Sequence, residues 1–403
     1  MFAVEQRRAS PAPAPAAGKP RSVAILAGQL AVGGAERQLY LWLSHIDRER
    51  FRPVVVTLHP DSGDYWESPI QSLGIPLLRV PRRSNRLSRL AELVRVLRPS
   101  RPELIHGWHL FTGPYAGAAA RLLGARASLG SLRGSLRAYR ELRAESLLTE
   151  WLTDAILVNS RHAAQQLVSV RPRWGQRVFA VPNAVEDRIE ERVRARARVQ
   201  RRWGVPDSRL WIGASGRFQE SKRFDLLIDM AAALRETGED FHLLLIGDGV
   251  CRDALQEKAR ALGLDGRVTF TGEQADSRFW LSALDVFCFP SVDEGMPNAV
   301  MEAAVAGVPV VGWASPFLRE LLDDGRAGVL VESGDPAALE RELRALLRAP
   351  ARRQQLAQTS RRHVLERFGI PPFVEGLTRA YEELLAGGRR RRYPGAAAVE
   401  HHA

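Results

Sequence analysis

The stretch CFPSVDEGMPNAVMEAAVAGVPVV, residues 288–311, sets the expected fold of this chain. Its apolar start predicts a buried strand that ends at Phe289, and Pro297 stands where the first turn of a helix would begin, because proline's missing N–H is unpaired there anyway. The loop between them presents backbone amides at a helix N-terminus, which attracts phosphate. Glu294 and Glu302 put two carboxylates at different depths of one pocket, an arrangement that can hold sugar hydroxyls. The alternative is that both glutamates only favour a helix start.

The same rhythm of strand, turn and helix extends in both directions along the chain. Strands are expected at 211–214, 242–246, 268–271, 286–289, 308–311 and 328–331, and earlier at 23–27, 54–58, 104–106, 155–158 and 178–181. Amphipathic segments such as 36–44 and 86–97 separate them, which indicates parallel strands joined by crossover helices. We therefore expect an α/β fold with two Rossmann-like, doubly wound parallel-sheet domains that face a deep cleft. Ligand residues should lie where strands end.

A change in composition suggests where the two domains meet. The segment EDRIEERVRARARVQRRW at 186–203 is highly charged and precedes Gly204-Val205-Pro206, as expected of an interdomain hinge. The expected division is a disordered tail at 1–20, a first domain at 21–185, a charged hinge at 186–207, a second domain at 208–365, a C-terminal helix at 366–386 that packs back on the first domain, and a disordered basic tail at 387–403.

Composition limits the class of protein. The chain has 403 residues, of which 45% are apolar and 26% are charged, so it falls in the globular range and is long enough for two or three domains. Its two cysteines, Cys251 and Cys288, cannot form a disulfide framework or a four-ligand zinc site, which favours a reducing compartment. The longest nearly apolar stretch, 303–318, is interrupted by prolines and shorter than the ~18 residues of a membrane span. We expect a soluble or peripherally attached protein.

The net charge of +12 suits an anionic partner, such as nucleic acid, a membrane surface or a phosphorylated substrate. Within WIGASGRFQESKRFDLL, residues 211–227, a strand runs into Gly216, and Arg217 and Lys222 flank the loop that follows. These two cations could clamp a diphosphate without a metal. Lys222 is informative because lysine occurs elsewhere only at 19 and 258. A solvated surface pair is the alternative.

Two glycine-containing turns repeat the pattern of a strand followed by a helix. LLLIGDGVCRDAL, residues 243–255, contains Gly249 in a turn that allows a ligand to approach the backbone closely. LAGQLAVGGAERQLYLWL, residues 26–43, places Gly33 and Gly34 directly before a helix that carries Glu36 and Arg37. The amides of these glycines could meet a diphosphate from across the cleft. Taken alone, either turn could be an ordinary loop.

Together these four segments resemble the retaining glycosyltransferases of family 4, which have the GT-B fold. The resemblance covers roughly residues 22–386 and is most specific in EGMPNAVME, GRFQESK, LIGDG and GGAERQ. NSRHAAQ at 159–165 and VPNAVED at 181–187 match more weakly. In VPNAVED the family usually has glycine at the position of Ala184.

The resemblance implies a role for each matching residue. Arg217 and Lys222 would bind the donor diphosphate, Glu302 would bond the ribose hydroxyls, and Glu294 would orient the transferred sugar. Further substrate contacts would come from Gly33, Gly34, Gly216, Gly249, Gly295, Met296, Pro297, Asn298 and Ala299. The first domain would then hold the acceptor and the second the nucleotide sugar.

The acceptor side is expected in LIHGWHLFTGPYAG, residues 104–117. A strand ends near His106 and a helix starts beyond Thr112, so either His106 or His109 can face the cleft. Family members often place a functional histidine here, and His109 is the preferred candidate. His106 is the second candidate, and the alternative for it is a packed core residue. Arg133, which follows the next strand, is a second candidate for binding the acceptor or a donor phosphate.

The reaction implied by the resemblance is retaining sugar transfer from a nucleotide-diphosphate sugar (UDP or GDP) to a cell-envelope glycolipid or polysaccharide. It would need no metal and no cofactor besides the donor as co-substrate, and would follow a front-face mechanism in the cytoplasm. Another GT-B enzyme, such as a sugar phosphorylase or a nucleotide-sugar epimerase, is one alternative. A non-enzymatic nucleic-acid binder is the other, but it leaves the glutamates and phosphate loops unexplained, so no nucleic-acid partner is expected.

Basic residues in the first half point to an anionic membrane surface as a further partner, at the inner face of the plasma membrane. They accompany the apolar face of 87–97, and each could contribute about 1 kcal/mol of attraction to an anionic leaflet. The residues are Arg82, Arg83, Arg86, Arg89, Arg95 and Arg98, followed by Arg133, Arg137, Arg140 and Arg143. The alternative is a solvated helix in an arginine-rich protein.

Overall fold

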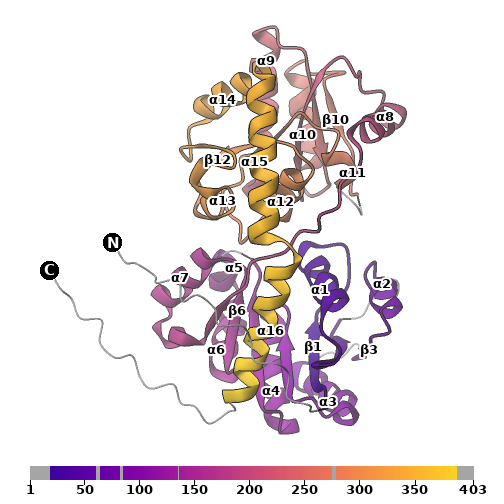
Figure 1. The fold of residues 1–403 in the computed structure, drawn as a ribbon, viewed down its shortest axis with the longest axis vertical. Helices are drawn as coiled ribbons and strands as arrows, with labels where there is room; N and C mark the ends of the chain where they lie inside the picture. Colours follow the sequence, from indigo (N-terminus) through magenta and orange to yellow (C-terminus); the bar gives the residue numbers. More distant parts are fainter. Residues whose placement is uncertain (1–18, 60–63, 82–84, 135, 275–277, 388–403) are drawn as a thin grey trace, which may run out of the picture.

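The computed structural model describes residues 19–59, 64–81, 85–134, 136–274 and 278–387. Within these ranges the chain forms two domains, each built on a parallel sheet with helices on both faces (Figure 1). The N-terminal sheet has the strand order β3-β2-β1-β4-β5-β6-β7, and the C-terminal sheet has the order β10-β9-β8-β11-β12-β13. The expected architecture of two Rossmann-like domains is confirmed.

The strands of the N-terminal sheet are β1 (Arg21–Ala27), β2 (Phe51–Thr57), β3 (Leu77–Arg79), β4 (Leu104–Gly107), β5 (Ala127–Leu132), β6 (Ala155–Val158) and β7 (Val178–Ala180). Its helices are α1 (Gly34–His45), α2 (Glu67–Ser72), α3 (Arg86–Leu97), α4 (Gly113–Leu123), α5 (Leu136–Glu141), α6 (Arg143–Leu152) and α7 (Arg161–Val170). Each strand expected in this half forms, with ends that shift by a few residues. The short edge strand β3 was not expected.

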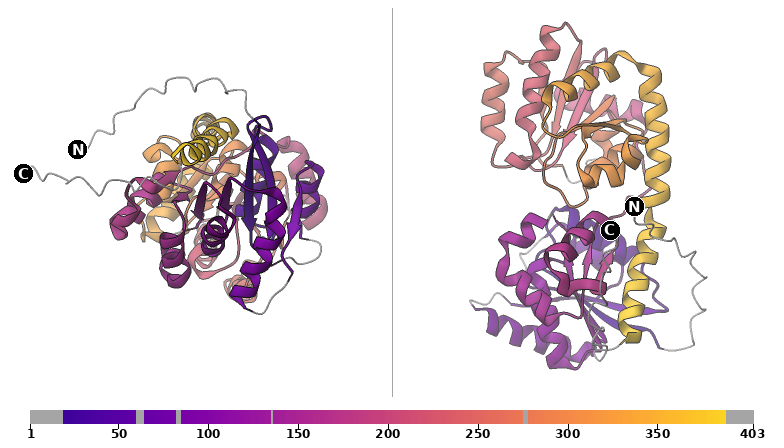
Figure 2. Two further views of the ribbon diagram at one scale, coloured as in Figure 1. Left: turned by 90° about the horizontal axis from the view of Figure 1, so that it is seen from below. Right: turned by 90° about the vertical axis from the view of Figure 1, so that its left-hand side faces the viewer.

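The C-terminal sheet contains β8 (Leu210–Ser215), β9 (Phe241–Ile246), β10 (Val268–Phe270), β11 (Val286–Phe289), β12 (Val310–Trp313) and β13 (Val329–Val331). Its helices are α8 (Arg192–Trp203), α9 (Phe224–Glu236), α10 (Arg252–Ala261), α11 (Arg278–Leu281), α12 (Asn298–Val305), α13 (Pro316–Leu321), α14 (Pro336–Arg348) and α15 (Pro350–Phe368). The last helix, α16 (Ile370–Gly387), returns to the N-terminal domain. Figure 2 shows α15 and α16 in yellow along one side of both domains.

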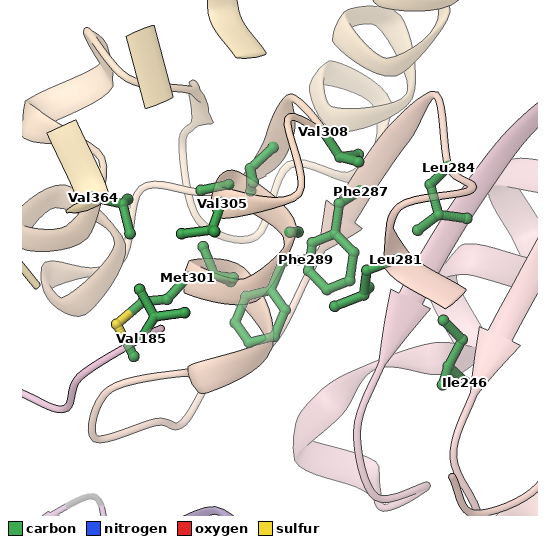
Figure 3. Packing of buried hydrophobic residues seen from close by; sticks show 14 of the residues in the cluster. Val185, Ile246, Leu281, Leu284, Phe287, Phe289, Met301, Val305, Val308 and Val364 are labelled. Atoms are coloured by element: carbon green, nitrogen blue, oxygen red, sulfur yellow. The ribbon is translucent and has the colours of Figure 1, made fainter. Parts of the chain in front are cut away.

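Helix α12 is fixed by burial on almost every side. Met301 and Val305 belong to a core cluster that also contains Phe287 and Phe289 of β11 and Val364 of α15 (Figure 3). A helix that is apolar all round must be surrounded by protein. The N-terminus of α12 therefore has a fixed place at the end of the sheet, where the loop after β11 delivers it.

The chain crosses between the two cores at two neighbouring points. Ala184 packs in the N-terminal core and Val185 in the C-terminal core, while Phe368 belongs to the C-terminal core and Phe373 to the N-terminal one. The two crossings touch, because the Val185 N–H donates a hydrogen bond to the Phe368 carbonyl at 2.9 Å. Any motion of one domain against the other must bend the chain at these two points.

The segment 186–207, expected to be a charged hinge, differs from that expectation over much of its length. It contains α8, whose Ala195 and Val199 are buried in the C-terminal core. Its arginines stay at the surface or pair with a carboxylate, as Arg192 and Arg196 do with Asp285 at 2.5 and 3.1 Å. The helix was not expected because most of its residues are charged and its apolar stripe is narrow.

Candidate active site

Each sheet has one point where the strand order changes direction, and the segments singled out from the sequence follow the strands at those points. The point lies between β1 and β4 in the N-terminal sheet and between β8 and β11 in the C-terminal sheet. Ligands of open α/β sheets bind in the crevice outside the carboxyl ends of such strands. GGAERQ follows β1, HGWHL follows β4, GRFQESK follows β8, and SVDEG follows β11.

The loops after β1 and β8 line a cavity of about 710 Å³ between the domains, together with the turn after β9 and the first residues of α12. Its volume suits a ligand of nucleotide size, since small-molecule sites usually enclose roughly 300–1,000 Å³. From the N-terminal domain it is lined by Val32, Gly33, Gly34, Arg37 and Trp66. In the C-terminal domain, the predicted site residues that line the cavity are Gly216, Arg217, Gly249, Asn298, Ala299 and Glu302.

Two helix N-termini meet at this cavity. Helix α1 begins at Gly34 and α12 begins at Asn298, and neither first turn is capped by a side chain. The Asn298 side-chain amide donates a hydrogen bond to the Gly34 carbonyl at 3.2 Å, which holds the two helix ends together across the cleft. Uncapped first-turn amides and aligned peptide dipoles attract anions. The cavity therefore offers two such ends to one negatively charged group.

The loop before α12 presses directly against the N-terminal domain. A Cβ on Gly295 would lie 2.8 Å from the Gly134 carbonyl oxygen, so only glycine fits without moving one of the domains. The Asn183 side-chain amide donates a hydrogen bond to the Met296 carbonyl at 3.3 Å. Pro297 is extended at φ −78° and ψ 107° and stands at the N-cap of α12, one residue before the position expected. Gly295 and Met296 are thus interdomain contacts in this structure.

The cations of the GRFQESK loop have different surroundings. Arg217 lines the cavity, whereas Lys222 does not and forms an ion pair with Glu294, which lies outside the cavity wall too. The Glu294 carboxylate also accepts a hydrogen bond from the Ser291 hydroxyl at 2.9 Å. Lys222 Nζ lies 3.9 Å from the position of a Cβ on Gly216, a residue that does line the cavity. Lys222 and Glu294 therefore form a pair directly beside the cavity.

The LIGDG turn owes its glycines to packing. A Cβ on Gly249 would come within 2.5 Å of the Phe218 carbonyl oxygen, and the residue has φ +155°. The equivalent position on Gly247 would come within 2.0 Å of the Gly216 carbonyl oxygen. The close approach expected for a ligand is made here by the GRFQESK backbone, and Gly249 borders the cavity beside it.

Glu302 pairs with a residue of the opposite domain to which the sequence analysis gave no role. Its carboxylate forms an ion pair with Arg37 in the first turns of α1, and Arg37 Nη2 lies 3.6 Å from Glu186. The Glu302 side chain is 6% exposed and that of Arg37 15%, so water screens this pair little. The only sequence signal for Arg37 was its place directly after the Gly33-Gly34 pair.

His109, the preferred acceptor-side candidate, follows β4 and is held by two partners. The Gly28 N–H donates to His109 Nδ1 at 3.3 Å, so Nε2 carries the proton that it shares with Glu36 Oε1 at 2.9 Å. Glu36 in turn lies over Gly33, where a Cβ would be 2.2 Å from Glu36 Oε2. Glu36 is a second site residue that was not assigned from the sequence.

His106 does not face the cleft, which matches the alternative of a core residue. It is fully buried, with Nδ1 2.8 Å from the Tyr381 hydroxyl of α16 and Nε2 2.7 Å from the Ser131 hydroxyl. Burial, with a smaller effect of the Arg133 charge, holds the pKa of His106 well below its ordinary 6.5. Its role is to join the returning helix to β4.

Arg133 lies next to these histidines with its charge incompletely matched. Its guanidinium stacks on Trp108 at 3.5 Å, and Nη1 donates to Asn183 Oδ1 at 3.4 Å. Nε and Nη2 are buried and have no hydrogen-bond partner among the described residues. Burial lowers the pKa of Arg133 to about 9. An anionic group that reached this position would supply the missing partner.

The burial of His106 predicts that the protein loses stability in mild acid. The pKa of His106 is low in the folded chain but ordinary in the unfolded one, so only the unfolded chain takes up a proton as the pH falls below 6.5. Unfolding then becomes easier, by about 1.4 kcal/mol between pH 7.5 and 5.5 for one such histidine. Urea titrations of the wild type and His106→Gln at both pH values should show the smaller acid loss in the variant. Equal losses would contradict the assignment.

Comparison with solved structures identifies the fold that the two domains form. HepE from Anabaena, in complex with UDP and glucose, superposes with a TM-score of 0.79 at 18% identity, over 90% of this chain and 100% of that one. WaaG, a glycosyltransferase involved in lipopolysaccharide biosynthesis, gives a TM-score of 0.71 at 17% identity, over 91% and 100%. The protein has the GT-B fold of glycosyltransferases.

Family models then identify its family. Residues 32–188 match the model described as Glycosyltransferase Family 4, and residues 209–349 match the model described as Glycosyl transferases group 1. The chain therefore belongs to the family 4, group 1 glycosyltransferases.

Two named relatives illustrate the range of the family. LpsE of Rhizobium meliloti, a lipopolysaccharide core biosynthesis glycosyltransferase, is 36% identical over 171 residues, which are 42% of this chain and 48% of LpsE. This chain thus spans about half the length of that relative. The 2-deoxystreptamine glucosyltransferase of Streptomyces kanamyceticus is 28% identical over 298 residues, or 70% of this chain and 76% of that enzyme.

Proposed function

We propose that this protein transfers a sugar from a nucleotide-diphosphate sugar, with UDP or GDP as the nucleotide, to a cell-envelope glycolipid or polysaccharide, with retention of anomeric configuration and without a divalent metal. The observation that carries the proposal is the interdomain cavity, where two uncapped helix N-termini and Arg217 converge. These groups suit a diphosphate because each presents positive charge to one place. Relatives with lipopolysaccharide in their names support the class of acceptor.

The donor would lie with its nucleotide toward the C-terminal domain. Glu302 lines the cavity and would accept hydrogen bonds from the ribose hydroxyls, sharing its carboxylate with Arg37. Arg217 would hold the diphosphate, with the amides at Gly34 and Asn298 on either side. The pair of Lys222 and Glu294 would then adjoin the sugar and the bond that breaks.

The step itself would be a front-face substitution. The acceptor hydroxyl forms a bond to the anomeric carbon on the side from which the diphosphate leaves, and the bond from that carbon to the phosphate oxygen breaks. The hydroxyl proton passes to a phosphate oxygen of the leaving group. Arg217 and Lys222 stabilise the negative charge that grows on the diphosphate, a contribution that needs no rearrangement because the cations are already in place.

The acceptor would enter beside His109, with Arg133 behind it. Glu36 and Gly28 engage both ring nitrogens of His109, so an acceptor hydroxyl that bonds to His109 would replace one of these two partners. The incompletely paired guanidinium of Arg133 favours an acceptor that carries an anionic group such as phosphate. We place the enzyme on the anionic inner leaflet of the plasma membrane, where such acceptors are anchored.

Incubation with UDP-, GDP- and ADP-sugars tests the reaction. We expect release of a nucleoside diphosphate that depends on a lipopolysaccharide or lipid-linked acceptor and persists in EDTA. Release of sugar 1-phosphate from a glycan and inorganic phosphate would instead identify a phosphorylase, and an altered free sugar an epimerase. Binding of nucleic acid without any turnover would contradict the proposal as a whole.

A further inference from the structure

Helix α3, whose apolar face suggested a membrane surface from the sequence, does not expose that face. The apolar face of α3 points inward, since Leu93 and Leu97 are fully buried and Leu90 and Val94 pack against the same core. Of the large apolar residues of that helix, Leu87 is the exposed one, at 80%. Arg82 and Arg83 lie outside the described residues. Helix α3 therefore offers charge but little apolar surface.

Helix α6 has the reverse arrangement, with its apolar face outward. Leu147 is 41% exposed, Leu148 42% and Trp151 61%, and they share one side of the helix by their spacing of three and four residues. The buried side carries Ser146, Thr149 and Glu150. Soluble helices normally present the opposite pattern.

The inward polar side makes specific contacts with its neighbours, which favour this orientation of the helix. The Ser146 hydroxyl donates to the Tyr139 carbonyl at 2.6 Å, and Glu150 forms an ion pair with Arg171 at 3.1 Å. Thr149 Oγ1 would lie 2.5 Å from a Cβ on Gly113, so α6 packs closely on α4 here. Rotating α6 to bury its leucines would expose these contacts and leave Glu150 without its partner.

Arginines surround this outward face. The Arg173 guanidinium stacks on the Trp151 ring at 3.4 Å, and Arg121 donates to the Trp151 carbonyl at 3.1 Å. Arg143, the first residue of the helix, and Arg140, near the end of α5, are both exposed. Exposed leucine and tryptophan side chains with basic neighbours match a bilayer surface, where apolar groups enter the headgroup region and cations meet anionic lipid.

We propose that α6 docks this chain on an anionic membrane, with Leu147, Leu148 and Trp151 as the inserting side chains. A second copy fits the face less well, because its arginines would meet their own equivalents and three side chains make a small apolar contact for a stable dimer. The inference rests on the membrane location proposed above and specifies which surface of the protein binds the membrane. It does not depend on the sugar-transfer reaction. It also brings the membrane near the acceptor, since Thr149 Oγ1 donates to the Leu110 carbonyl, one residue after His109, at 3.4 Å.

Flotation with lipid vesicles tests the proposal. The full chain should float with vesicles of phosphatidylglycerol and phosphatidylcholine, and not with phosphatidylcholine alone. The triple variant Leu147→Ser, Leu148→Ser, Trp151→Ser should lose binding by about tenfold or more. Arg140→Gln with Arg143→Gln should weaken the preference for anionic lipid. The control is Val193→Ser on α8, a substitution of an apolar residue that is 72% exposed in the other domain.

Calorimetric binding of UDP and GDP to each variant separates this proposal from the transferase proposal. Loss of flotation with unchanged nucleotide binding supports membrane docking by α6, and absence of nucleotide binding in the wild type would count only against the proposed donor. Unchanged flotation of the triple variant, or no flotation of the wild type, would overturn docking by α6. So would a dimer, seen by size-exclusion chromatography, that the triple variant dissociates.

Discussion

Replacing Lys222 by alanine is expected to lower kcat for sugar transfer by about 10²- to 10³-fold, the usual cost of removing one preorganised group that stabilises charge in a transition state. Lys222 lies beside Gly216 at the edge of the cavity and is held by Glu294, so its charge is in place before the diphosphate begins to leave. Nucleoside diphosphate release at saturating donor measures the effect. The loss should fall on kcat more than on KM, because the developing charge appears only in the transition state.

Lys258 provides the matched control. It also pairs with an acidic residue, Asp229 at 2.6 Å, but in an exposed position on α10. Lys258→Ala should transfer sugar at the wild-type rate. Thermal melting of Lys258→Ala should show a small change, since half-exposed ion pairs contribute little to stability. Lys222→Ala should melt lower, because it leaves the mostly buried Glu294 carboxylate without its partner, so transfer is measured well below the melting temperature of the variant. Near wild-type turnover of Lys222→Ala would remove Lys222 from the proposed mechanism.

The order of strands and loops could be predicted from the sequence because it depends on the local pattern of apolar and polar residues. Apolar runs that alternate with amphipathic helices specify parallel strands, and parallel strands put their following loops at the same edge. This is why the loops after β1, β4, β8 and β11 could be expected to meet. Strand β3 was missed because Arg79 and the flanking Pro76 and Pro81 interrupt its apolar run, whereas the apolar run of β7, which is equally short, continues to Val181.

The partners of the site residues could not be predicted, because they come from distant parts of the chain. Arg37 and Glu302 are separated by 265 residues, and His106 and Tyr381 by 275. No periodicity links such positions. The sequence identified the carboxylate and the histidine, but only the packing of α1 and α16 decides what each one touches.

Helix α6 shows a different limit of the sequence. The spacing of Leu147, Leu148 and Trp151 marks one apolar face, and an apolar helix face is normally expected to lie in the protein interior. Burial of Glu150 on the other side depends on Arg171, which follows α7. Periodicity therefore indicates that a helix has two faces but does not decide which of them meets solvent.

Replacing Glu294 by alanine is expected to abolish most transfer, by about 10²- to 10³-fold, while the donor nucleotide still binds. Glu294 lies outside the wall of the nucleotide-sized cavity, whereas Glu302 lies within it. Its carboxylate is shared by Ser291 and Lys222, so its loss removes the partner that holds Lys222 in place. Calorimetry with the nucleoside diphosphate and the transfer assay together measure this division of roles.

Glu302→Ala is the companion variant and should have the opposite effect, because it should weaken nucleotide binding itself. Because Lys222 and Glu294 act as one pair, the double variant Lys222→Ala, Glu294→Ala should lose little more activity than either single variant. Additive losses would mean that the two side chains act separately. If Glu294→Ala abolished nucleotide binding, the carboxylate would have to contact the nucleotide itself, and the assignment of Glu302 to the ribose would lose its basis.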